Sequence, residues 1–285
     1  MAGPPVLHLS APAKINLYLH VTGRRDDYHL LDSLVVFAGL ADGIELSPSQ
    51  AIEIVICGPF ADAAGLPEEN LALKAARALA SAAEITAGVR IRLTKRIPVA
   101  AGLGGGSADA AAVLTGLMRL WSVPRDAVDL ASIGVRLGAD VPACLAGRPV
   151  FVGGIGDQLA AAPRLPEAGL LLVNPGVELA TASVFAGRRG GFSPAARFDA
   201  TPSSAAELAD ILAARSNDLT EPARRLAPVI DDVLESIRRA PGCRLARMSG
   251  SGATCFGLFD DMTAAAAARA SIHCGDWWVA ATALT

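Results

Sequence analysis

Hydrophobic and polar residues alternate along several stretches in the first half of the chain, a pattern typical of β-strands. In the clearest stretch, Ala13–Val21, a strand would place four polar side chains on one face: Lys14, Asn16, Tyr18 and His20. Shorter apolar stretches predict further strands over Leu34–Phe37, Ile44–Ser47, Ile52–Cys57 and Val89–Lys95.

Three segments of the first half instead predict helices. Glu69–Ala83 is rich in Ala and Leu, and the other two are Ala108–Trp121 and Asp126–Leu137. The first half therefore begins with strands and then mixes helices with strands.

The second half has a simpler order of elements. The pattern predicts, in turn, a helix, two strands, a helix and a strand: Pro228–Arg239, Cys243–Met248, Thr254–Phe259, Met262–Ile272 and Asp276–Thr282. This order suits an antiparallel sheet with helices on one face, as in ferredoxin-like α+β folds. A domain boundary is expected near Gly153–Gly156.

Composition limits the class of protein. Apolar residues make up 52% of the 285 residues and aromatic residues only 5%, so Ala, Val and Leu dominate the apolar content. We find no uninterrupted apolar run of about 18 residues, which a membrane-spanning helix requires. The start, Met1–Leu9, lacks the basic and apolar stretches of a secretion signal. We therefore expect a cytoplasmic protein without a membrane partner.

Charge and cysteine usage exclude further classes. The net charge is -3, and acidic and basic residues are interspersed rather than gathered in the basic stripe of a nucleic-acid-binding protein. The five cysteines are scattered without a CxxC pair, which disfavours disulfide frameworks and zinc sites. Only three lysines accompany the arginines: Lys14, Lys74 and Lys95. Lysine offers a compact charge and a tunable pKa, which makes these positions candidates for chemistry.

A glycine-rich turn, Pro98–Ser107, lies between a predicted strand and a predicted helix. Glycines let a ligand approach the backbone closely, and Ser107 is predicted to cap the following helix. The free N–H groups and the positive end of the helix dipole favour an anion. The turn therefore predicts a phosphate site, with a simple packing turn as the alternative.

Glycine spacing narrows the kind of phosphate site. A Walker A loop ends in Gly-Lys-Ser/Thr, whereas here Ser107 follows Gly106 directly. A dinucleotide fingerprint needs glycines at the first, third and sixth places. Counting from Gly102 or from Gly104, the sixth place holds Ser107 or Asp109. A different nucleotide-binding loop is therefore favoured.

Three ordered motifs resemble those of the GHMP kinases, a superfamily that includes galactokinase, homoserine kinase and mevalonate kinase. The glycine turn with Ala108–Ala111 is similar to the second motif, Ala11–Leu17 to the first and Met248–Thr254 to the third. The resemblance covers nearly the whole chain. It implies a two-domain α+β fold: a ribosomal-protein-S5-like domain over residues 1–155 and a ferredoxin-like domain over residues 156–285.

Within the superfamily, the chain most resembles the kinases of 4-diphosphocytidyl-2-C-methyl-D-erythritol. The resemblance rests on Lys14–Leu17 leading to Asp27–His29, and on Gly138–Pro142, Gly154–Asp157 and Asn217–Leu219. It implies ATP-dependent phosphorylation of the 2-hydroxyl of that cytidine-diphosphate-linked substrate, in non-mevalonate isoprenoid synthesis. The family usually has Gly where this chain has Asp27.

The resemblance implies two catalytic residues. Asp140 would accept the proton of the attacking alcohol, and Lys14 would hold Asp140 ionised and offset developing negative charge. Taken alone, Asp140 could instead end a turn beside Gly and Pro. Lys14 could instead form a surface ion pair or extend its ammonium from an edge strand into water.

The resemblance also implies an ATP site. Pro98, Leu103 and the glycines Gly102, Gly104, Gly105 and Gly106 would hold the phosphates with Ser107. Asn70, Leu71 and Lys95 match positions near the adenine, although Asn70 could equally cap its own helix. Mg²⁺ would take most ligands from phosphate and water, with Ser107 as a candidate protein ligand. Asp109 would either assist through water or lie on a helix surface.

For the second substrate, the resemblance implies an aromatic site. Tyr28 and Phe185 would sandwich cytosine, and His29 would hydrogen-bond to its edge. Asn16 and Thr181 would contact the rest of the small-molecule substrate. The turn around Gly250 would support the site, and the histidines His8, His20 and His273 are interpreted as ordinary surface or packed residues.

Other functions remain open at this point. The chain could be another GHMP kinase, of the homoserine or mevalonate type, or a nucleotide-binding regulator that keeps the fold without turnover. An NAD-dependent oxidoreductase is disfavoured by the glycine spacing. The sequence leaves the oligomeric state open.

Overall fold

Two long strands, β1 (Leu7–Arg25) and β2 (Tyr28–Ser49), form a hairpin at the start of the chain. The computed structural model describes residues 6–272 and 275–285; the prediction for His273 therefore lies outside the described residues. The described chain folds into two compact units, each built from separate stretches of sequence. Unit 1 contains the described residues up to Ala13, with Leu40–Val99 and Gly104–Gly147; unit 2 contains Lys14–Gly39, Ala100–Leu103 and the chain from Arg148 onward.

Strand β2 corrects one prediction, because it runs without a break where two short strands were expected. The sequence between those strands contains two glycines and Asp42, which interrupt the apolar pattern. In the structure Asp42 is buried at 1% exposure and accepts hydrogen bonds from the backbone N–H groups of Arg96 and Ile97. A polar residue with such partners can continue a strand inside the core.

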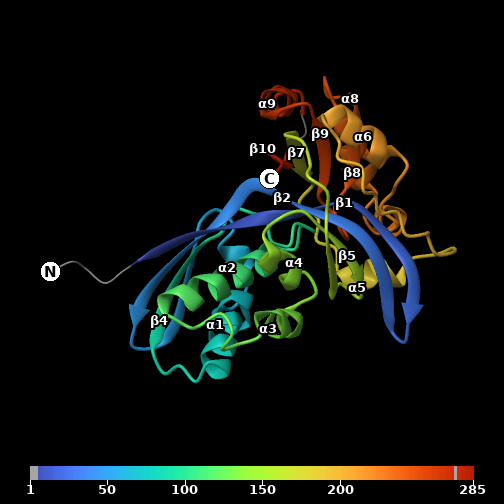
Figure 1. Ribbon diagram of the computed structural model, residues 1–285. Helices are drawn as coiled ribbons and strands as arrows, with labels where there is room; N and C mark the ends of the chain where they lie inside the picture. Colours follow the sequence, from blue (N-terminus) through green and yellow to red (C-terminus); the bar gives the residue numbers. More distant parts are fainter. Residues whose placement is uncertain (1–5, 273–274) are drawn as a thin grey trace. The chain divides into compact units, whose positions relative to one another are not determined.

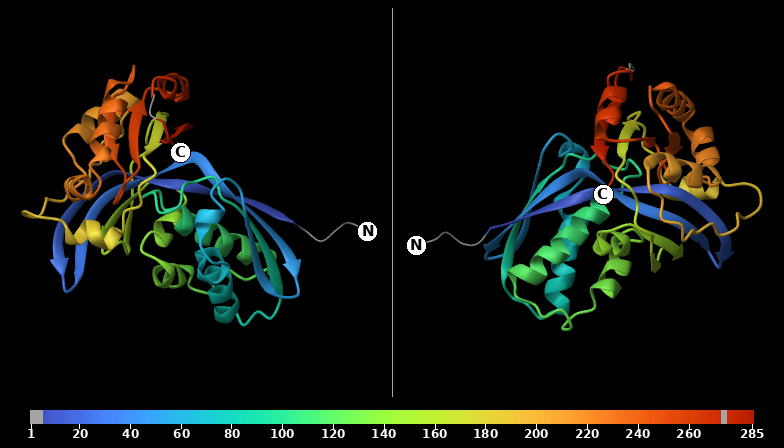
Figure 2. Two further views of the ribbon diagram at one scale, coloured as in Figure 1. Left: turned by 180° about the vertical axis from the view of Figure 1, so that it is seen from behind. Right: turned by 45° about the horizontal axis from the view of Figure 1, so that its top comes forward.

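Unit 1 combines part of the six-stranded sheet with four helices among its described residues, seen from different sides in Figures 1 and 2. Strand β4 (Gly88–Thr94) pairs parallel with β3 (Ile52–Cys57) and antiparallel with the end of β2. The helices are α1 (Leu71–Ala82), α2 (Gly105–Leu120), α3 (Leu130–Leu137) and α4 (Val141–Ala146), and two short 3₁₀ turns cover Asp62–Ala64 and Pro67–Glu69. Alternate residues of β4 and the apolar faces of α1 and α2 form one core.

In unit 2, a four-stranded antiparallel sheet has the order β10-β7-β9-β8. Its strands are β7 (Gly169–Asn174), β8 (Leu245–Met248), β9 (Cys255–Phe259) and β10 (Trp278–Ala283). Helices α8 (Val229–Arg239) and α9 (Met262–Arg269) pack on this sheet and share its core, as Figure 1 shows. This is the ferredoxin-like arrangement, so the α+β prediction is confirmed.

Strand β7 was missing from the sequence interpretation. All six of its residues are buried, and its centre is a continuous apolar run. Such a run does not alternate, and periodicity alone does not separate it from a buried helix.

Additional elements complete unit 2. Strands β5 (Val150–Gly154) and β6 (Gln158–Ala161) form a hairpin, and β5 pairs with the start of β2. Between β7 and α8 lie three helices: α5 (Thr181–Ala186), α6 (Ala205–Ala213) and α7 (Thr220–Leu226). The division of the chain into domains 1–155 and 156–285 stays a prediction.

The predicted helices are present with shifted ends. Helix α3 begins at Leu130, after the cap Asp129, rather than at Asp126. Helix α2 begins at Gly105, three residues before the predicted start. It has 16 residues, and no helix in the described ranges is both long and apolar enough to cross a membrane.

Candidate active site

The predicted site residues fall into two sets, one in each unit. Unit 1 holds the predicted base and most of the predicted nucleotide site: Asn70, Leu71, Lys95, Pro98, Gly104, Gly105, Gly106, Ser107 and Asp140. Unit 2 holds the remaining residues: Lys14, Asn16, Tyr28, His29, Gly102, Leu103, Thr181 and Phe185.

The start of α2 leaves several backbone N–H groups available. Gly104 is the N-cap residue, with a left-handed φ of 62°, and no side chain caps the helix. The first helical hydrogen bond runs from Ala108 N to Gly104 O, at 2.9 Å. The prediction that Ser107 caps α2 is therefore wrong, because the helix begins two residues earlier. An uncapped first turn made of glycine and serine is suited to an anion.

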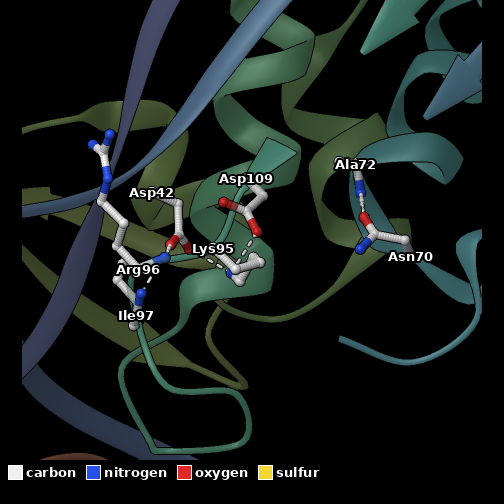
Figure 3. Close-up of polar contacts among 7 residues, drawn as sticks. All are labelled: Asp42, Asn70, Ala72, Lys95, Arg96, Ile97 and Asp109. Carbon is white, nitrogen blue, oxygen red and sulfur yellow. Dashed lines mark hydrogen bonds and ion pairs between the residues drawn. The ribbon is translucent and has the colours of Figure 1, made fainter. Parts of the chain in front are cut away.

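A buried ion cluster lies beneath this first turn (Figure 3). The Lys95 ammonium donates to Asp109 Oδ2 at 2.8 Å and also to Asp42 Oδ2. The three side chains are at most 5% exposed. A Cβ atom built on Gly105 would lie 3.3 Å from Lys95 Nζ, so the positive charge sits directly against the turn. Asp109 is buried, and the alternative of a surface position is wrong.

Charge balance explains the pKa values in this cluster. Two carboxylates share one ammonium, and the site is nearly dry. Burial raises the pKa of Asp109 to about 7; Lys95 opposes this shift and Asp42 reinforces it. Burial lowers the pKa of Lys95, but the attraction of Asp109 and Asp42 outweighs burial, and the net shift is upward. Lys95 therefore stays charged beneath the turn.

Asp42 is a residue that the sequence interpretation missed. Besides pairing with Lys95, its Oδ1 accepts from Ile97 N at 2.9 Å and from Arg96 N at 2.5 Å (Figure 3). Asp42 thus holds the chain where it enters the glycine turn, while Lys95 reaches Asp109 where the chain leaves it. In the sequence, Asp42 appeared only as a charged residue between two predicted strands.

Asn70 and Leu71 lie beside the same turn. The Asn70 side chain accepts from Ala72 N at 2.9 Å, so the alternative that it caps α1 is confirmed (Figure 3). A Cβ atom on Gly106 would lie 3.6 Å from Leu71 Cδ1. The start of α1 is therefore adjacent to the start of α2.

Asp140 is half-buried at the N-cap of α4, where its carbonyl accepts from Cys144 N at 3.1 Å. A Cβ atom on the preceding Gly138 would lie 3.9 Å from Ser107 Oγ. The turn that carries Asp140 therefore lies beside the first turn of α2.

In unit 2, Lys14 and Asn16 form a buried polar chain on β1. Lys14 Nζ donates to Asn16 Oδ1 at 2.8 Å, and Asn16 Nδ2 donates to Ser33 Oγ at 2.8 Å. Asn16 N donates to Ser249 Oγ at 3.1 Å. Lys14 is 4% exposed and Asn16 5% exposed. The alternative of a surface lysine is therefore wrong.

The part of the glycine turn that belongs to unit 2 packs on this chain. Lys14 N donates to Leu103 O at 2.8 Å. Gly102 has a φ of 75°, and a Cβ atom there would lie 2.5 Å from Gly252 O and 2.9 Å from Ser249 O. Residues of all three predicted motifs therefore meet within unit 2, backbone against backbone.

Helix α5 carries two residues predicted for the second substrate, Thr181 and Phe185, and a third, His29, contacts it. Thr181 Oγ1 lies 3.0 Å from Ser251 Oγ, and one turn later Phe185 stacks on His29, with ring centroids 5.1 Å apart. Tyr28 is 62% exposed. The structure therefore pairs Phe185 with His29, and the Tyr28–Phe185 sandwich stays a prediction.

The environment of His29 favours a neutral ring. Burial lowers the pKa of His29, and the guanidinium groups of Arg24 and Arg188 lower it further. A neutral imidazole offers one donor and one acceptor, which suits contact with an uncharged base.

Protein groups for a metal ion are sparse. Across residues 6–272 and 275–285, no group of three His, Cys, Asp or Glu side chains is placed to hold one. Asp109 Oδ1 is buried without a hydrogen-bond partner, but its other oxygen pairs with Lys95. These residues do not fit a protein-built metal cage.

Comparison with known proteins identifies the class. The model of the GHMP kinases N terminal domain matches residues 70–148, and that of the GHMP kinases C terminal domain matches residues 199–274. The chain belongs to the GHMP kinases, and it is a kinase of the kind that acts on a small molecule.

Two individual relatives carry the name of one particular kinase. The 4-diphosphocytidyl-2-C-methyl-D-erythritol kinase of Paramagnetospirillum magneticum is 54% identical, over 95% of this chain and 96% of its own. The enzyme of that name from Rhodospirillum rubrum is 51% identical, over 96% of this chain and 91% of its own. The resemblance predicted from the motifs is therefore confirmed.

Two solved structures of GHMP kinases are similar to this fold. A 4-(cytidine 5'-diphospho)-2C-methyl-D-erythritol kinase superposes with a TM-score of 0.78 at 37% identity, over 98% of this chain and 99% of its own. A homoserine kinase from Cytophaga hutchinsonii gives 0.76 at 18% identity, over 100% of this chain and 96% of its own. The second similarity shows the fold alone. ATP use follows from the kinase family.

Proposed function

We propose that this kinase transfers the γ-phosphoryl group of ATP to the 2-hydroxyl of 4-diphosphocytidyl-2-C-methyl-D-erythritol, a step in non-mevalonate isoprenoid precursor synthesis. The observation that carries the proposal is the 54% identity to a relative of that name over nearly the whole chain. The geometry is consistent with phosphoryl transfer, which depends mainly on positioning and charge neutralisation.

The ATP phosphates would bind at the uncapped first turn of α2, over Gly104–Ser107. The Lys95 ammonium lies beneath Gly105 at the same place, with its charge shared by Asp109 and Asp42. Asn70 and Leu71, at the start of α1, would contact the adenine. The cap made by Asn70 uses its side-chain oxygen, which leaves its N–H groups to meet the base.

Asp140 would act as the general base. It lies on the turn next to Ser107, and a carboxylate there can accept the proton of an alcohol that attacks a bound phosphate. Lys14 would supply positive charge to the reacting oxygens. Its burial strengthens that effect, because a charge in a dry site is poorly screened.

Mg²⁺ would arrive with the nucleotide, held mainly by phosphate oxygens and water, since the described residues offer no cage of their own. The hydroxyl of Ser107 is the side-chain group at the start of α2 that would hold it. Bound there, Mg²⁺ would neutralise charge on the phosphates.

The cytidine end of the substrate would bind at α5. Phe185 offers a ring face, Tyr28 an exposed second ring and His29 a neutral hydrogen-bonding edge. Base stacking on an aromatic ring contributes about 1–3 kcal/mol. Asn16 and Thr181 would contact the rest of the substrate. A cytoplasmic location stays a prediction.

The test is a coupled assay of ADP release with three alcohols: the cytidine-linked methylerythritol, homoserine and mevalonate. We expect turnover with the first. Turnover with only the other two would overturn the substrate while leaving the kinase class intact. ATP binding without ADP release from any alcohol would favour a nucleotide-binding regulator.

A further inference from the structure

The side chain of Asn217 holds the turn between β8 and β9. We call residues 248–254 the third-motif turn. Asn217 is 6% exposed, and its amide nitrogen donates to Met248 O and to Gly250 O, both at 2.8 Å. Its Oδ1 accepts from Leu219 N at 2.9 Å. Two carbonyls and one N–H surround the amide, so only one orientation satisfies all three.

Within unit 2, the third-motif turn contacts both the glycine turn, at Gly102, and strand β1, at Asn16. Ser249 Oγ accepts from Asn16 N at 3.1 Å and lies 3.3 Å from Gly102 O, to which it donates. Gly250 has a φ of 56°, and a Cβ atom there would lie 3.2 Å from Gly102 O and 3.3 Å from Asn16 Oδ1. The same Asn16 oxygen accepts from Lys14 Nζ. The shape of the turn therefore sets how Gly102 meets the Lys14–Asn16 pair.

The neighbours of Asn217 are fixed to the strand that carries Lys14. Leu19 N donates to Ser216 O at 3.0 Å, and Asp218 N donates to Leu19 O at 2.8 Å. Asn217 thus reaches the third-motif turn from a backbone segment that is bonded to β1 on both sides. It connects β1 to the turn by a second route, besides the direct bond from Asn16 to Ser249.

We infer that Asn217 is a positioning residue for phosphoryl transfer. By holding the carbonyls on either side of Ser249, it keeps the third-motif turn in the shape that seats Gly102 against Lys14 and Asn16. The inference rests on the proposed function for its reaction. The competing explanation is that Asn217 serves only to start α7, through its bond from Leu219 N.

Two variants separate these explanations. Asn217→Asp keeps the oxygen that accepts from Leu219 N but loses the donors to both carbonyls, whereas Asn217→Ala loses all three bonds. We expect both variants to lower kcat and kcat/KM together, by about tenfold or more, as for an interaction that matters in the transition state. A normal Asn217→Asp enzyme beside an impaired Asn217→Ala enzyme would overturn the inference.

A matched control accounts for lost stability. Asp261 caps α9 through a bond from Ala264 N at 2.8 Å, so Asp261→Ala should destabilise unit 2 without touching the third-motif turn. Assays are run below the melting temperatures of all variants. We expect Asp261→Ala to keep kcat within about twofold of wild type. Kinetic losses at Asn217 no larger than those of this control would overturn the inference.

Two further measurements cover the case in which Asn217→Asp does not fold. Ser249→Ala removes the bonds to Asn16 and Gly102 and leaves α7 intact; it should also lower kcat, and a wild-type kcat would contradict the inference. In Asn217→Ala, hydrogen exchange of the Gly250 and Gly252 amides should rise. Unchanged exchange there would contradict it too.

Failure of the proposed function looks different. If wild type phosphorylates only homoserine or mevalonate, the substrate assignment fails, and the variants are compared on that alcohol instead. If wild type phosphorylates none of the three, hydrogen exchange in the third-motif turn still decides whether Asn217 holds it.

Discussion

Lys95 donates a 2.8 Å hydrogen bond to Asp109, and this bond joins the residue after β4 to the first turns of α2. The glycine-rich turn lies between these two residues in the chain. Its two ends are therefore tied together through a buried ion pair. Asp42 adds to this connection, because its carboxylate accepts hydrogen bonds from the backbone N–H groups of Arg96 and Ile97.

Lys95→Met should destabilise the protein strongly. Removing one partner of a buried pair leaves uncompensated charge, which typically costs about 3–5 kcal/mol in the free energy of unfolding. Urea unfolding measures the effect. Because the Lys95 charge opposes the rise in the pKa of Asp109, its loss should raise that pKa further. Lys74→Met is the control, because Lys74 is exposed on α1. We expect it to change the free energy of unfolding by no more than about 0.5 kcal/mol. A similar small change for Lys95→Met would show that the carboxylates find other partners.

Gly102→Ala should lower kcat by about tenfold or more. The residue has a φ of 75°, and the new Cβ would meet Gly252 O at 2.5 Å, so the glycine turn must move away from the third-motif turn. Gly176→Ala is the control, since Gly176 has a φ of 76° with open space around it. Backbone strain alone costs about 1–2 kcal/mol. Equal kinetic effects of the two changes would rule out the clash as the cause.

Sequence pattern predicted much of this fold, because many of its elements are amphipathic. The helix around Leu79 and the strand around Ile91 bury mainly one face, and periodicity marks that face. β7 buries both faces, so its pattern carries no period. The unbroken course of β2 past Asp42 depends on hydrogen bonds from residues more than 50 positions away. A local pattern contains no information about such partners.

The candidate site was predictable to a similar degree. The sequence motifs identified Lys14 and Asn16 as candidates. The structure adds that both are buried and that Lys14 donates a hydrogen bond to Asn16. Asp42 and Asn217 act through side-chain bonds to distant backbone groups, and residue type alone does not reveal such a role. The stacking of Phe185 on His29 was not predicted, because it depends on where α5 lies in the folded chain, and the sandwich of cytosine between Tyr28 and Phe185 stays a prediction.

Asp140→Asn should reduce turnover far more than ATP binding. A positioned general base contributes about 10²- to 10⁴-fold to rate, and an amide cannot accept the proton. Single-turnover kinetics and nucleotide titration measure the two effects separately. Asp129→Asn, at the cap of α3, is a control that should keep turnover near wild type. Equal losses of turnover and ATP binding in Asp140→Asn would count against its role as base.

Phe185→Ala should raise KM for the cytidine-linked substrate and leave KM for ATP unchanged. Loss of one stacking face costs about 1–3 kcal/mol, which corresponds to about 5- to 150-fold in affinity. Phe192→Ala is the control, because Phe192 is a 53% exposed phenylalanine on the same unit. A matching rise in KM for ATP would indicate a general disturbance of the fold.

His29 should titrate below the usual histidine pKa of about 6.5. Burial is the first cause, followed by Arg24 and Arg188, so the folded state prefers the neutral ring. Since the unfolded chain binds the proton more readily, the contribution of His29 to stability is present above pH 6.5 and is lost as pH falls from there through the lower pKa of the folded state. Arg24→Gln should raise the pKa of His29 in an NMR titration, whereas the neighbouring Arg25→Gln should change it little. An Arg24→Gln titration identical to wild type would leave burial alone as the cause.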